Sequence, residues 1–128
     1  MTKCTGQAQS GLSMIRGDSA TFHFHREDVN GTIIRETPTD VFFTVKNTFD
    51  DQPFVIQKKM SDGTITEDAN FEYHLTILPE DTNNLEFGEY VYDVEVIRNA
   101  EGTDKQTISK GSFTLETEVT YASNEGGE

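Results

Sequence analysis

The chain contains 128 residues, which is enough for one domain with its own hydrophobic core and too few for two. Nine Phe and four Tyr, with no Trp, supply large side chains that favour β-strands, and no Ala-rich or Leu-rich helical stretch accompanies them. The formal net charge of −13 and the pI near 4.4 exclude phosphate backbones and anionic membranes as partners, so the sequence predicts binding to neither nucleic acid nor a membrane.

The two ends of the sequence differ in composition from its middle. Residues 1–12 are rich in Thr, Gln, Ser and Gly and show no hydrophobic period, which predicts a flexible N-terminal arm. The folded domain is predicted over residues 13–120, and residues 121–128 are predicted to be a disordered tail. The only cysteine, Cys4, lies in the arm, so no disulfide within the chain is expected. No apolar run of signal-peptide length follows Met1, which predicts synthesis in the cytoplasm.

Alternating apolar and polar residues predict about seven strands joined by short turns. In chain order they are an interrupted strand over residues 14–25 and strands over residues 32–35, 41–46, 54–58, 71–77, 88–96 and 106–120. The interruption, Arg-Gly-Asp at residues 16–18, matches the tripeptide that integrins bind, but a turn between strands is the favoured interpretation. A corner over residues 79–85 is expected to contain one helical turn capped by Asp81 or Thr82.

The strand over residues 88–96 carries the clearest signal of the fold. Tyr90, Tyr92 and the two valines that follow them share one parity, which is typical of a half-buried strand. An aromatic residue just after a glycine-containing corner is typical of a tyrosine corner, and Gly88 and Tyr90 hold these positions. The sequence therefore predicts an all-β, immunoglobulin-like antiparallel β-sandwich of about seven strands without a disulfide. The structural residues expected in its core and corner are Gly88, Tyr90, Tyr92, Phe22, Phe24, Phe43 and Phe113.

Three histidines are the candidate metal ligands. His23 and His25 are two residues apart on a predicted strand, so their rings share one face of the sheet. His74, the only other histidine, is the candidate third ligand from a second strand. A solvated sheet face explains the same pattern without an ion and is the favoured interpretation. An enzyme would need a metal at these histidines.

Adjacent carboxylates occur at residues 50–51, 67–68 and 80–81. Adjacent residues on a strand point to opposite faces, so these pairs do not form a two-carboxylate hydrolytic site, and solvated charge is the favoured interpretation. The sequence contains neither a nucleophile elbow nor a glycine-rich phosphate loop ahead of a helix. A non-enzymatic protein without a cofactor is therefore predicted.

A set of short motifs runs through the domain. They are Arg16-Gly17-Asp18 ahead of Phe22 and Phe24, the segment Val41–Lys46, the pair Lys58-Lys59, the series Asp81-Thr82, Leu85, Gly88, Tyr90, Tyr92 and Asp93, and the segment Gly111–Thr114. In this pattern the chain resembles, from Met14 to about Val119, the small immunoglobulin-like virion proteins of tailed bacteriophages that infect Gram-positive hosts. The N-terminal domain of phage baseplate upper proteins is among the proteins that it resembles.

The resemblance implies a non-enzymatic structural component of a virion, made in the cytoplasm of the bacterial host. Such a protein docks on other virion proteins as a capsid decoration, neck or tail/baseplate accessory protein, and it can form a homo-oligomer on a symmetric lattice. The docking elements are expected in residues 1–12 and in the loop over residues 47–53. The alternative is a carbohydrate-binding or adhesive module that contacts a glycan on the host surface, for which Phe42 is the most suggestive outward-facing side chain.

Overall fold

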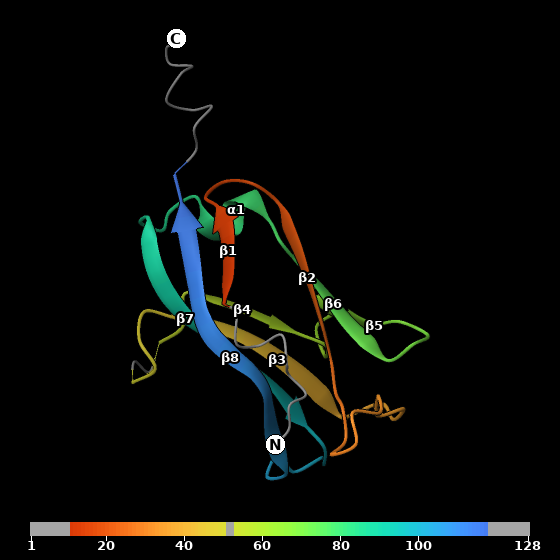
Figure 1. Ribbon diagram of the computed structural model, residues 1–128. Helices are drawn as coiled ribbons and strands as arrows, with labels where there is room; N and C mark the ends of the chain where they lie inside the picture. The colour runs from red at the N-terminus through yellow and green to blue at the C-terminus, as the bar shows by residue number, and fades with distance from the viewer. Residues whose placement is uncertain (1–10, 51–52, 118–128) are drawn as a thin grey trace.

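The computed structural model describes residues 11–50 and 53–117, and these residues form strands with one short helix (Figure 1). The elements are β1 (Leu12–Ile15), β2 (Ala20–His25), β3 (Asp40–Lys46), β4 (Ile56–Lys59), β5 (Ile65–Glu67), β6 (Glu72–Ile77), α1 (Pro79–Thr82), β7 (Gly88–Ile97) and β8 (Lys105–Glu116). Most of the predicted N-terminal arm and all of the predicted C-terminal tail lie outside the described residues. Within the described part, no helix is long and apolar enough to cross a membrane.

The strands form two sheets that pack as a sandwich. One sheet has five strands in the order β1-β8-β7-β3-β4, and the other has three in the order β2-β6-β5. The chain therefore passes from β1 at the edge of the first sheet directly to β2 at the edge of the second (Figure 1). This arrangement confirms the predicted all-β immunoglobulin-like sandwich. One strand pair departs from the predicted antiparallel arrangement, because β1 pairs with β8 in parallel.

Two predicted strands differ in more than their bounds from the observed ones, and β5 was not predicted. The segment 14–25 is two strands in different sheets, and the first of them begins at Leu12, inside the predicted arm. Residues 32–35 were predicted as a strand, but the structure has only an isolated bridge between Glu27 and Ile33. The Asp28 carboxylate accepts hydrogen bonds from the backbone N–H groups of residues 30 and 32. These bonds close a turn where the strand was predicted to begin.

The turn between β1 and β2 is fixed to the corner that precedes β7. The backbone N–H of Gly17 donates to the fully buried hydroxyl of Thr82 at 2.8 Å, and Gly17 has the positive φ of 86° that glycine accepts readily. The Arg16 guanidinium lies 4.1 Å from the centre of the Phe87 ring and donates to the Leu85 carbonyl. The Arg-Gly-Asp tripeptide is therefore a packed turn, as the favoured interpretation required, with its arginine held against the domain.

Aromatic rings from both sheets form the centre of the core. Phe24 of β2 packs against Phe43 of β3 and Tyr92 of β7, with ring centroids 6.1 and 6.3 Å apart. Phe43 also contacts Tyr92 and, edge to face, Phe113 of β8. Phe22 completes the group at 6.2 Å from Phe113. Five of the six aromatic residues predicted for the core and corner thus lie in one contiguous cluster that joins the two sheets.

The predicted tyrosine corner is present. The Tyr90 hydroxyl donates to the Glu86 carbonyl, four residues upstream, at 2.8 Å. Gly88 begins β7 with a φ of 141°. The helical turn α1 was also predicted, but the predicted cap at Asp81 or Thr82 was wrong, because the N-cap residue is Leu78. Asp81 accepts the Leu78 N–H and pairs with Lys58 Nζ at 2.7 Å.

We predict that Tyr90→Phe lowers the free energy of unfolding by about 1 kcal/mol, because the ring keeps its packing while the corner hydrogen bond is lost. Urea denaturation measures the change as a lower midpoint with an unaltered slope. The control Ser19→Ala, at an exposed position between β1 and β2, should stay within about 0.5 kcal/mol of the parent. A Tyr90→Phe midpoint equal to that of the parent would contradict a stabilising role for the corner bond.

Candidate functional site

The three histidines share the outer face of the three-stranded sheet. His23 of β2 is directly paired with His74 of β6, and their rings stack with centroids 5.7 Å apart. His25 is paired with Glu72, one step along the same two strands. Their neighbours Phe24 and Tyr73 point inward and are buried, which is why the histidines point outward. The predicted common face of His23 and His25 is confirmed.

Glu72 lies between the three imidazoles. Its Oε2 is 3.5 Å from His23 Nδ1 and 3.9 Å from His25 Nδ1, and its Oε1 is 3.9 Å from His74 Nε2. His25 in turn pairs with Glu27, with 2.7 Å between Nε2 and Oε2. One central carboxylate therefore faces all three histidines, and His25 has a second carboxylate of its own.

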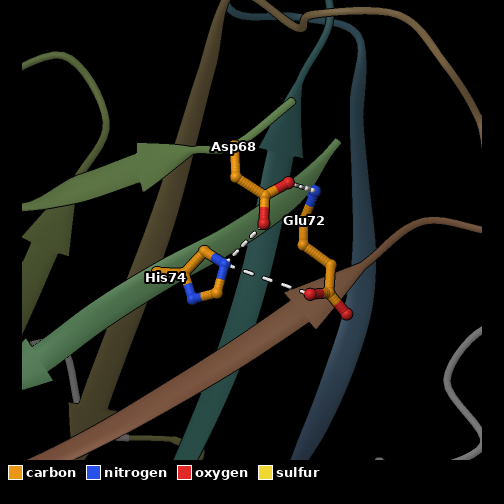
Figure 2. Close-up of side chains that lie close together, drawn as sticks. All are labelled: Asp68, Glu72 and His74. Atoms are coloured by element: carbon orange, nitrogen blue, oxygen red, sulfur yellow. Dashed lines mark hydrogen bonds and ion pairs between the residues drawn. The ribbon is translucent and has the colours of Figure 1, made fainter. Parts of the chain in front are cut away.

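Asp68 reaches the same face from the turn between β5 and β6 (Figure 2). Its Oδ1 accepts the backbone N–H groups of Asn70 and Glu72, which fixes the carboxylate at the end of the turn. Its Oδ2 accepts a hydrogen bond from His74 Nε2 at 2.8 Å. The bond from His74 first, and the N–H of Glu72 next, lower the pKa of Asp68 below its ordinary value of 3.8.

The groups that converge are not the three candidate histidines. Among the described residues, Asp68, Glu72 and His74 each present one ligand atom within 4.8 Å of the other two (Figure 2). His23 stacks on this group, and His25 is directed to Glu27. The alternation of Glu72 and His74 on one strand was a visible signal for two members. Asp68 had no such signal, because a turn rather than a strand carries it to the site.

A groove of about 430 Å³ runs along β2, next to the histidine face. It is lined by Leu12, Thr21, Phe22, His23, Phe24, His25, Glu72 and Tyr92. Within residues 11–50 and 53–117, β2 pairs with β6 alone, so its other edge keeps backbone N–H and C=O groups without a strand partner. The groove thus combines an apolar floor, a polar rim and a free strand edge.

The exposed aromatic rings are not where the sequence placed them. Phe42 points outward but is partly buried, and Lys59 Nζ lies 5.4 Å from its ring centre. Phe49 and Phe54, in the loop between β3 and β4, are instead about half exposed, at 53% and 51%. Phe49 borders a small hollow that includes Asp93, whose pKa is raised by burial and by nearby Glu95.

Comparison with known proteins adds no family to this description. No family model matches the chain, and no curated protein matches it.

We predict that a carboxyl NMR titration places the pKa of Asp68 below 3.8 and that His74→Ala raises it toward that value. Asp62 is the internal control, because its pKa is lowered by hydrogen bonds from Thr64 and not by His74. A carboxylate whose pKa is lower in the folded state than in the unfolded state stabilises the domain at pH values above its unfolded-state pKa. The stability difference between the parent and Asp68→Asn should therefore begin to decrease as the pH falls to about 4, and it should vanish only below the lowered folded-state pKa of Asp68. An unchanged Asp68 titration in His74→Ala would contradict the assigned pair.

Proposed function

We propose that this chain is a non-enzymatic structural component of a tailed-phage virion that docks on another virion protein through the free edge of β2. The resemblance of its motifs to small virion proteins suggests the setting. The groove along β2 is the observation that carries the docking role, because it offers main-chain hydrogen bonds and apolar contacts in the same place.

The chemistry of the groove defines the partner segment. A strand added beside β2 would satisfy the edge N–H and C=O groups, and every second side chain would enter the groove. Leu12, Phe22 and Tyr92 give those positions apolar surroundings. The partner is therefore an extended segment with alternating apolar residues. Because this chain carries a net charge of −13, basic residues around that segment would favour association.

Repetition on a virion lattice would make modest contacts sufficient. A groove of this size accommodates a short segment, which implies weak binding by a single copy. Copies held close together on one symmetric surface gain avidity without further contacts. A homo-oligomer on the lattice is part of this proposal.

A glycan-binding adhesive module is the second candidate function. The observation in its favour is the half-exposed Phe49 ring beside Asp93. Sugars stack on aromatic faces, and carboxylates accept hydrogen bonds from sugar hydroxyl groups. The hollow at this position holds only about 40 Å³, so it would take no more than the edge of one sugar ring. This small size ranks the glycan function below docking at β2.

We predict that antibody raised against the purified domain labels phage particles from the producing strain in immunogold electron microscopy. Labelled particles would locate the protein on the capsid, neck or tail. Unlabelled particles beside labelled host cell surfaces would contradict the virion proposal and favour the glycan-binding module, in which Phe49→Ala should then abolish cell labelling.

Docking at the edge of β2 can be tested directly in assembled particles. We predict that Leu12→Asp reduces the amount of domain that copurifies with particles by about tenfold or more, because it places a charge in the groove. Ser13→Asp is the matched control, since Ser13 is the exposed neighbour on the same strand. Circular dichroism must show both variants folded. Equal incorporation of the two variants would contradict docking at β2. Repeating the test on a chain without residues 2–10 separates a partner strand from pairing by the chain's own N-terminal segment.

A further inference from the structure

We propose that Asp68, Glu72 and His74 form a binding site for a divalent transition-metal ion of the zinc class. This inference is independent of the virion proposal, because it depends only on the side chains of the outer sheet face. Two carboxylates and one imidazole are a donor set that zinc accepts, with water in the fourth position. Calcium and magnesium prefer sets made of oxygen alone, so the imidazole selects against them.

The distances suit one shared ion. Ligand atoms around a tetrahedral zinc lie about 3.4 Å apart, given bonds of about 2.0–2.1 Å. His74 Nε2 is 2.8 Å from the Asp68 oxygen and 3.9 Å from the Glu72 oxygen, and all three atoms are within 4.8 Å of one another (Figure 2). Shifts of well under an ångström per side chain would bring them to equal spacing. The ion would replace the hydrogen bond that now joins His74 Nε2 and Asp68 Oδ2.

The surroundings hold the three ligands in place. Two backbone N–H bonds orient Asp68, and β6 carries both Glu72 and His74 on one face of a paired strand. His23 Nδ1 lies 3.5 Å from the Glu72 oxygen that points away from His74, so His23 can orient this carboxylate while its other oxygen binds the ion. Stacking of His23 on the His74 ring restrains that ring in the same way.

Charge also favours a dication at this position. With neutral imidazoles, the two carboxylates give the site a local charge of about −2, and they belong to a chain whose net charge is −13. The side chains of His74 and Asp68 are each 37% exposed, so the ion could enter from solvent without opening the core.

Calorimetric titration with Zn²⁺ alone at neutral pH tests this inference. The experiment uses the full chain with Cys4→Ser, so that the thiol outside the described residues does not bind the metal. We expect one zinc per chain, and a dissociation constant that rises at least about tenfold in His74→Gln and in Asp68→Asn. Co²⁺ should give visible absorption bands that disappear in the same two variants.

His25→Gln is the matched control, because His25 lies on the same face but is directed to Glu27. We expect its zinc affinity to stay within about twofold of the parent, since it removes no proposed ligand. Absence of zinc binding in the parent chain, or equal affinity in His74→Gln, would overturn the inference. A loss in His25→Gln as large as that in His74→Gln would overturn the proposed ligand set. Circular dichroism establishes that each variant is folded.

Discussion

The attachment of the turn between β1 and β2 to the corner before β7 determines the rest of this structure. The bond from Gly17 to buried Thr82, together with the stacking of Arg16 on Phe87, fixes the point at which the chain leaves the five-stranded sheet. β1 then pairs with β8, and β2 starts the three-stranded sheet. Within residues 11–50 and 53–117, the edge of β2 that has no strand partner and the groove beside it follow directly from this change of sheet.

The register of β2 against β6 couples the core to both proposed sites. Phe24 and Tyr73 are paired inward in that register, so His23 and His74 are paired outward beside Glu72. A slip of one residue would exchange the two faces, and burial of the aromatic cluster opposes it strongly. The metal-ligand geometry is therefore maintained by hydrophobic packing on the other side of the same strands, although none of the three ligands belongs to the core.

Local periodicity was sufficient to predict most of the elements, but it missed β5 and did not identify all of the strand partners. The tyrosine corner was predictable because Gly88, Tyr90 and the alternation after them lie within one short segment. The parallel pairing of β1 with β8 was not, because it joins residues about a hundred positions apart that no local pattern relates. The same limit, that local patterns do not show which distant segments meet, explains why only part of the metal site was predictable. His23 and His25 were predictable as one face, but the place of Asp68 depends on how a turn folds against the neighbouring strand.

Residue-resolved amide hydrogen exchange of the free domain tests the central claim that β2 is an open edge. β2 has six residues, and only the amides that bond to β6 should be protected, so slow and fast exchange should alternate along it. Amides of β3, which lies between β4 and β7, should be protected throughout the paired region and serve as the internal reference. Uniform protection of all β2 amides would show that another segment or a second copy already pairs with this edge, and it would contradict the account.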